Sequence, residues 1–507
     1  MGTSVRLPSE LTQFLGIDGP QSLLLRGPPG SGKTTLSLAL LEAFSGRRIL
    51  VTSRVPPMEL RREFPWLGET GKGATQVIEA RSPRAGASGA AEAVGKLDML
   101  LKGDSASTDQ LRSFLWLPEA MQAAWAALSE EDRTLLVVDS WDALVEAYLG
   151  SQKVPEGGGL DRAEVERLLL ARMAEAPVHL VLVLECGEQT QLDYLVNAVV
   201  ETRVEFSDER LERWLYLRKL RGIRIANAMY PFTLEGGKFE CIEPMRPYAE
   251  IPSGRAESEP DPMPGHIWPG STDFAESFGR LSLGGLTLLE LDGSAPQAVP
   301  YLLLAPAMGA VASQGGPVLI LPDTKPTPDL LWKRLQFTLP QKKFVERIRF
   351  LGVPRANGGG SGALDPRFAR MVLELRPPDP AAVVAPPTEV EEFMRSGDGA
   401  GAPSLSLLNT GGMYAVANAF HLPVGPESAR FLPSAIHAFL GGRQTHAIVA
   451  GRSDDPLLQV MRPLASLQLR VRMRQGRVLR HGTAPWTPNF LLAAGQEHVP
   501  YQLLRVV

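Results

Sequence analysis

The chain has 507 residues, more than one hydrophobic core usually organises, so we expect two to four domains. Hydrophobic residues at 44% and charged residues at 21% are ordinary for a folded protein, and the net charge of −4 gives no global reason to expect nucleic acid or anionic lipid as a partner. Cys186 and Cys241 form no CxxC motif, which argues against a disulfide framework or structural zinc and favours a reducing cytoplasm. No signal-peptide pattern opens the sequence, so the expected location is cytoplasmic, with no membrane partner.

The first 245 residues alternate apolar strands with helices, the pattern of a parallel sheet covered by helices. The expected strands are residues 22–25, 49–52, 135–138 and 179–184, and the expected helices include residues 35–44 and 163–174. A segment rich in Pro, Gly, Ser and Glu follows, with little that could join a core. We therefore predict a domain of residues 1–250 and a linker of residues 251–270.

A glycine-rich motif follows the first expected strand and leads into a helix at Thr35; it reads Gly27-Pro28-Pro29-Gly30-Ser31-Gly32-Lys33-Thr34. Glycines let the backbone curl so that several N–H groups point at one phosphate chain, and the helix N-terminus adds positive potential. The strand–loop–helix context identifies the motif as a P-loop. We predict that residues 27–35 bind ATP, with Lys33 at the β- and γ-phosphates and the Thr34 hydroxyl on Mg²⁺.

Asp139 ends the apolar strand of residues 135–138. A strand that ends in Asp brings one carboxylate to the carboxyl edge of a parallel sheet, where the metal of a P-loop site is bound. Asp139 is therefore the second predicted ligand of Mg²⁺.

Several further segments resemble the KaiC branch of the RecA superfamily, and the resemblance covers residues 7–245. They are Val138-Asp139-Ser140 with Ala143-Leu144, residues 217–222 (LRKLRG) and Tyr230-Pro231-Phe232. Within that branch, residues 7–11 (LPSEL), 53–55 (SRV) and 64–67 (FPWL) resemble the archaeal gas-vesicle regulator D (GvpD) family.

The resemblance implies roles for residues outside the P-loop. In KaiC-like rings the Lys and Arg of a KxRG segment reach the γ-phosphate held by the neighbouring subunit, which implies trans-acting roles for Lys219 and Arg221 in a homo-oligomeric ring. Cations of this kind stabilise charge that develops on the phosphoryl group. The alternative is that both residues belong to the solvated face of a hairpin.

KaiC-like ATPases usually carry a glutamate just after the second strand, where it activates the attacking water. Here Ser53 and Arg54 follow that strand, and an arginine cannot act as a base near neutral pH. Glu185, after the strand of residues 179–184, is the candidate substitute beside the catalytic residues Lys33 and Asp139. Loss of a positioned base slows chemistry by roughly 10²–10⁴-fold. We expect tight ATP binding and weak ATPase activity.

The second half repeats the landmarks of the first, in the same order and about 260–270 positions later. The P-loop position, residues 293–300, reads GSAPQAVP, so Val299 replaces the lysine and Pro300 the threonine, while Asn409 replaces the metal-side Asp. We predict tandem RecA-like α/β domains, the first intact and the second, residues 271–507, degenerate and unable to bind triphosphate. The alternative is the strand repetition common to all α/β folds.

Residues 355–402, dense in Gly and Pro, are an expected irregular insertion. The apolar residues 299–321 are interrupted by prolines and are expected to form a buried helix and strand.

Six arginines and no acidic residue lie between residues 462 and 480, at positions 462, 470, 472, 474, 477 and 480. On a strand, Arg470, Arg472 and Arg474 would share one face, which suits phosphate groups or an acidic protein surface. The GvpD family is associated with arginine-rich regions needed for repression. The alternative is a strand edge that carries charge against aggregation.

Three functions are compatible with these features. The first is an ATP-dependent regulatory switch on a protein partner, such as a transcription regulator, with a gas-vesicle role implied by the resemblance. The second is a RadA-like, DNA-binding recombinase-type ATPase, which is disfavoured because no helix-hairpin-helix module, zinc module or activating glutamate is visible. The third is a scaffold that binds nucleotide without turnover.

Overall fold

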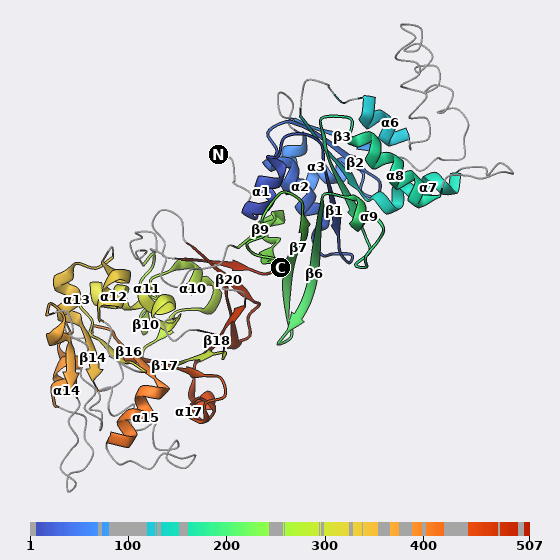
Figure 1. The fold of residues 1–507 in the computed structure, drawn as a ribbon. Coiled ribbons are helices and arrows are strands. Elements are labelled where there is room, and N and C mark those ends of the chain that lie inside the picture. The colour runs from blue at the N-terminus through green and yellow to red at the C-terminus, as the bar shows by residue number, and fades with distance from the viewer. Residues whose placement is uncertain are drawn as a thin grey trace. The chain divides into compact units, whose positions relative to one another are not determined.

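In the computed structural model the chain forms two compact units, Met1–Ile242 with Val506–Val507, and Glu243–Arg505. Each unit contains one large sheet with helices packed against it (Figure 1). The structure describes residues 7–68, 74–80, 119–126, 128, 133–151, 161–242, 257, 259–293, 295, 299–323, 328–336, 338–352, 366–374, 388–397, 402–419, 445–474, 477–494 and 501–507.

The sheet of the first unit has nine strands in the order β3-β2-β4-β5-β1-β6-β7-β8-β9. It is parallel from β3 to β6 and antiparallel from β6 to β9. The strands are β1 Gln21–Arg26, β2 Arg47–Thr52, β3 Thr75–Glu79, β4 Thr134–Asp139, β5 Val178–Leu184, β6 Ala198–Ser207, β7 Arg210–Leu220, β8 Met229–Thr233 and β9 Glu240–Cys241. The four strands expected from the sequence are all present.

Helices cover both faces of this sheet, because alternate residues of the parallel strands point to opposite sides. Leu23 and Leu25 pack in one core with α1 and α2, whereas Leu24 packs in the other with α6, α7 and α8. The helices are α1 Ser9–Leu15, α2 Lys33–Ala43, α3 Pro57–Glu63, α6 Glu119–Ala126, α7 Trp141–Ser151, α8 Arg162–Met173 and α9 Leu192–Leu195. The expected helices of residues 35–44 and 163–174 are α2 and α8.

The second unit contains a ten-stranded sheet in the order β15-β14-β13-β16-β17-β12-β18-β19-β20-β21, and a small pair, β10 with β11. Without the edge strand β15, this order matches the first sheet strand for strand, which confirms the predicted tandem RecA-like fold. The strands are β10 His266–Ile267, β11 Leu281–Ser282, β12 Leu286–Leu291, β13 Val318–Leu321, β14 Ile348–Gly352, β15 Val372–Glu374, β16 Ser404–Asn409, β17 Thr445–Arg452, β18 Leu467–Arg474, β19 Arg477–Ala484, β20 Phe490–Ala494 and β21 Tyr501–Arg505.

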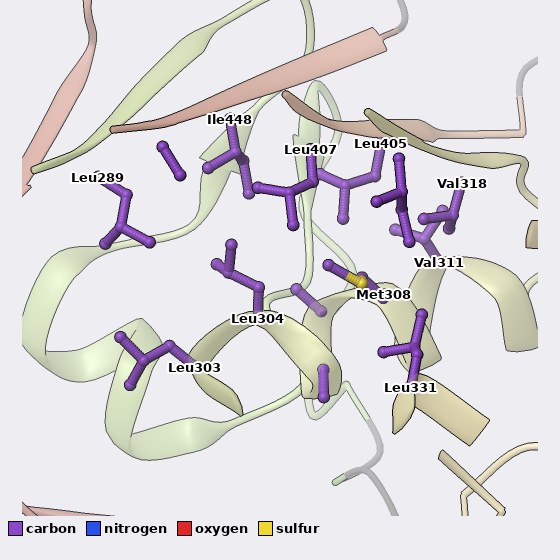
Figure 2. Packing of buried hydrophobic residues seen from close by; sticks show 14 of the residues in the cluster. Leu289, Leu303, Leu304, Met308, Val311, Val318, Leu331, Leu405, Leu407 and Ile448 are labelled. Atoms are coloured by element: carbon purple, nitrogen blue, oxygen red, sulfur yellow. The ribbon is translucent and has the colours of Figure 1, made fainter. Parts of the chain in front are cut away.

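The long apolar segment of residues 299–321 forms the buried helix α11 and the strand β13, as predicted. Leu304, Met308 and Val311 of α11 pack against strand residues that include Leu407 and Ile448 (Figure 2). No helix in the described part of the chain is long and apolar enough to cross a membrane. The helices of this unit are α10 Thr272–Phe278, α11 Val299–Ser313, α12 Pro328–Leu335, α13 Gln341–Arg347, α14 Thr388–Arg395, α15 Thr410–Ala419 and α17 Pro456–Met461.

Two segments differ from their sequence-based description. The predicted linker of residues 251–270 contains β10 near its end, and its Ile267 and Trp268 are buried, with Ile267 in the core of the second unit. The predicted irregular insertion of residues 355–402 includes β15 and α14, and Phe393 is buried against the sheet. In both segments the Gly- and Pro-rich composition predicted irregular structure. A few buried apolar residues are nevertheless enough to anchor such a segment to the core.

Candidate functional site

The P-loop joins β1 to α2, and its glycines adopt conformations that other residues rarely accept. Gly27, Gly30 and Gly32 have φ angles of 155°, 73° and 90°. A Cβ atom on Gly27 would lie 2.4 Å from the carbonyl oxygen of Thr202. Helix α2 begins at Lys33, and within the described chain no side chain caps its first N–H groups. These N–H groups and the helix dipole form a site for an anion.

Lys33 occupies the centre of the loop. Its Nζ donates hydrogen bonds to the carbonyl oxygens of Gly27 and Pro28, each over 2.8 Å, and its side chain is buried. Burial lowers the pKa of Lys33, while the negative charges of Glu185 and Asp139 act in the opposite direction. A buried ammonium group whose hydrogen-bond partners are neutral carbonyls fits an anionic phosphate chain as its ligand.

Thr34 and Asp139 meet across the site, as the sequence predicts. The Thr34 Oγ1 donates to the Asp139 Oδ2 over 2.7 Å. Burial raises the pKa of Asp139, and the hydrogen bond from Thr34 and the charge of Lys33 oppose this rise. A hydroxyl and a carboxylate are the hard oxygen ligands that Mg²⁺ prefers, so this pair fits a magnesium ion that also binds phosphate oxygens.

Glu185 lies at the same edge of the sheet, but it is paired with Arg54. The Arg54 Nη1 lies 2.7 Å from the Glu185 Oε2. Arg54 follows β2, where the expected water-activating glutamate is missing. It binds Glu185, which is the candidate substitute for that glutamate. While Arg54 binds it, this carboxylate oxygen is occupied by the guanidinium.

Sequence reasoning missed Asp142, which organises this edge of the site. Its Oδ2 accepts a hydrogen bond from the Glu185 backbone N–H over 2.8 Å, and its Oδ1 accepts from the Arg162 Nη2 over 2.6 Å. In the sequence, Asp142 is visible only as a second acidic residue three positions after Asp139. Its contact with Glu185 depends on β4 and β5 being neighbours, which the sequence alone does not establish.

The predicted trans-acting residues lie away from the P-loop of their own chain. The Lys219 Nζ donates to the backbone oxygen of Asp193 over 2.8 Å. The Arg221 backbone N–H donates to Asn197, whose own N–H donates to Ser22 at the start of β1. The Arg221 backbone is thus near the amino end of β1, whereas Asp193, the partner of Lys219, also binds the side chain of Arg26, the last residue of β1, over 2.8 Å.

A different arginine of β7 contacts the P-loop. The Arg213 Nη1 donates to the carbonyl oxygen of Gly30 over 2.7 Å, and burial lowers the pKa of Arg213. The hairpin of β6 and β7 brings this residue to the loop from a distance of 183 positions in the chain. No motif in the sequence singles out Arg213.

The second unit has neither a lysine nor an aspartate at the described positions that correspond to Lys33 and Asp139. Val299, at the start of α11, is buried where the first unit has Lys33. Asn409 is also buried, and its Nδ2 donates to the carbonyl oxygen of Leu321 over 3.2 Å. Residues 294 and 296–298 of this loop lie outside the described residues. Loss of triphosphate binding here stays a prediction.

The arginines of residues 462–480 do not form one uniform surface. Strand β18 pairs with both β12 and β19, so the alternative of a charged strand edge is wrong. Arg462 binds the buried Glu290 through two hydrogen bonds of 2.8 and 3.0 Å, and the Arg470 Nε lies 3.8 Å from the same carboxylate. Arg480 is fully buried, with its guanidinium 4.4 Å from the ring centroid of Phe278. It is unavailable to a partner.

The strand order, the P-loop and the contact between Thr34 and Asp139 define a P-loop protein with a RecA-like fold. No family model matches the chain. Two curated relatives from Halobacterium salinarum do match: Protein GvpD1 is 27% identical over 346 residues, 67% of this chain and 60% of the relative, and Protein GvpD2 is 27% identical over 344 residues, 66% and 65% respectively. Over about two thirds of its length this chain is similar to the GvpD proteins.

The matched region spans about three fifths of the curated relatives. Among solved structures, a KaiC-like protein from Pyrococcus horikoshii is 15% identical, with a TM-score of 0.29, over 44% of this chain and 89% of that protein. The similarity to GvpD rests on the curated relatives.

Proposed function

We propose that this protein is an ATP-binding regulatory switch that hydrolyses ATP slowly and whose nucleotide state controls engagement of a protein partner. The observation that carries the proposal is the arrangement at the carboxyl edge of the first sheet. This edge combines a complete P-loop with Thr34 and Asp139, the two proposed ligands of Mg²⁺. It also carries Glu185, a carboxylate that is bound by Arg54. Binding without an available base favours long-lived nucleotide states, and such states suit a switch.

The similarity to GvpD proteins supports a regulatory role, and a transcription regulator linked to gas vesicles is the partner we infer. ATP and Mg²⁺ are the proposed ligands. The second unit, which keeps the fold and lacks the charges of the site at Val299 and Asn409, is the proposed partner-binding or structural domain.

Steady-state ATP hydrolysis, measured with and without DNA, tests this function. We expect turnover well below the usual enzyme median of about 10 s⁻¹, and no stimulation by DNA. Replacing Arg54 by Glu should raise the rate, because a carboxylate would then follow β2. Brisk hydrolysis by the wild type that is lost in Glu185→Gln would contradict slow turnover and identify Glu185 as the base. Strong stimulation by DNA would favour the recombinase-type function.

The trans roles of Lys219 and Arg221 predict assembly. If one subunit's hairpin reaches its neighbour's P-loop, a repeated head-to-tail contact closes a ring or grows a filament. Native mass should rise with Mg²⁺-ATP, and the rise should be reduced by salt. Lys219→Ala and Arg221→Ala should weaken assembly and leave the fold intact, whereas Arg172→Ala, at an exposed surface pair, should change neither. A monomer both with and without nucleotide rules the ring out.

A further inference from the structure

The ion pair between Arg54 and Glu185 spans the metal-side end of the nucleotide site. Strands β2, β4 and β5 are neighbours, and Arg54, Asp139 and Glu185 lie at or just beyond their carboxyl ends. Arg54 therefore reaches across the end of β4, past Asp139, to bind Glu185. The pair is accessible, with 57% of the Arg54 side chain and 26% of the Glu185 side chain exposed.

The backbone next to each partner is held independently of the ion pair. The Ser53 N–H donates to the Asp139 carbonyl oxygen over 2.8 Å, and the Ser140 N–H donates to the Ser53 Oγ over 2.9 Å. On the other side, the Glu185 N–H is held by Asp142. The guanidinium of Arg54 can therefore exchange one partner for another by side-chain rotation, without a change in the backbone.

The site carries charges of both signs before any ligand binds, and its further carboxylate, Asp142, is paired with Arg162. Lys33 and Arg54 are opposed by Asp139 and Glu185, and the four groups interact electrostatically with one another. A bound triphosphate adds more negative charge than one Mg²⁺ neutralises. If Thr34 and Asp139 hold Mg²⁺, the terminal phosphates would bind next to this pair, and the charge of Arg54 already acts on Asp139.

We propose that Arg54 is an intrachain sensor of the terminal phosphate: it exchanges Glu185 for that phosphate when the nucleotide is ATP and keeps Glu185 when the nucleotide is ADP. The inference rests on the proposed function, because it requires ATP at the P-loop. Glu185 competes with the phosphate for one guanidinium, so the ion pair sets how strongly the site distinguishes ATP from ADP. This would give the switch its two states within a single chain.

Binding of Mg²⁺-ATP and Mg²⁺-ADP to the full chain, measured by calorimetry, tests the proposal. Arg54→Gln should weaken ATP binding by about tenfold or more, the scale of a lost charge-assisted hydrogen bond, and should change ADP binding by less than about twofold. Glu185→Gln should strengthen ATP binding by about threefold or more, since the competitor is removed, with ADP binding unchanged. Arg54→Lys should retain part of the preference for ATP.

The matched control is Arg172→Gln, which removes the same charge from an exposed surface pair with Glu175 in the same unit. It should leave both affinities unchanged. Equal losses of ATP and ADP affinity in Arg54→Gln, or weaker ATP binding in Glu185→Gln, would overturn the sensor. If the wild type binds neither nucleotide, the proposed function itself fails. If the wild type binds ATP, Lys33→Ala loses it, and Arg54→Gln keeps the ATP-to-ADP ratio, the sensor alone is wrong.

Discussion

Replacing Lys33 by Ala should lower the affinity for ATP by an order of magnitude or more. The ammonium group is buried, and its hydrogen-bond partners are the loop carbonyls of Gly27 and Pro28 rather than a carboxylate. The ammonium group can therefore exchange these carbonyl partners for phosphate oxygens. The substitution removes the positive charge at the centre of the loop. Equilibrium titration with Mg²⁺-ATP measures the effect.

Lys238→Ala is the matched control, because Lys238 is an exposed lysine of the same unit. It should bind ATP as the wild type does. Val299→Lys should create no second site, since Pro300 still lacks a hydroxyl for Mg²⁺ and an N–H for phosphate. A wild-type titration with two ATP sites per chain would show that the second unit is not degenerate.

Replacing Glu201 by Gln should destabilise the first unit by about 2 kcal/mol, because a buried carboxylate loses its charge-assisted hydrogen bonds. Glu201 is buried and accepts hydrogen bonds from the half-exposed Arg203 and Arg218. The buried Arg26 lies 3.4 Å from Glu201 and keeps its ion pair with Asp193. Glutamine keeps the shape and loses the charge. Urea unfolding of the full chain measures the change, and hydrogen exchange of the β1 and β6 amides assigns it to the first unit.

The same residue predicts a dependence on pH. Burial alone would raise the pKa of Glu201, but the hydrogen bonds and charges of Arg203 and Arg218 outweigh it, so the pKa is lowered from its usual 4.5. A lowered pKa in the folded state contributes stability above the unfolded pKa, and this contribution is lost as pH falls through the folded value. The difference between wild type and Glu201→Gln should therefore shrink below about pH 4.5.

An exposed carboxylate supplies the control. Glu175→Gln breaks the surface pair with Arg172 and should cost no more than about 1 kcal/mol. A loss of similar size in Glu201→Gln, constant between neutral pH and pH 3, would contradict the view that the charge of Glu201 strengthens its hydrogen bonds with Arg203 and Arg218.

Local patterns in the sequence were enough to predict the P-loop, the strands that carry it and the meeting of Thr34 with Asp139. Each of these depends on a short segment: glycines that permit positive φ angles, or an apolar run that ends in a carboxylate. The internal repeat was also visible, because corresponding strands stay in order along the chain. The shared strand order of the two sheets confirms that inference.

The partners of individual charges were decided only by the tertiary structure. Glu185 meets Arg54, and Arg213 meets Gly30, because the strand order brings residues together that lie more than 100 positions apart. Arg480 belongs to the same arginine-rich segment as Arg470, yet packing encloses Arg480 among aromatic rings and leaves Arg470 near Glu290. Side-chain periodicity predicts which face of a strand a residue occupies, but the neighbouring elements determine whether that face meets solvent, a core or an opposite charge.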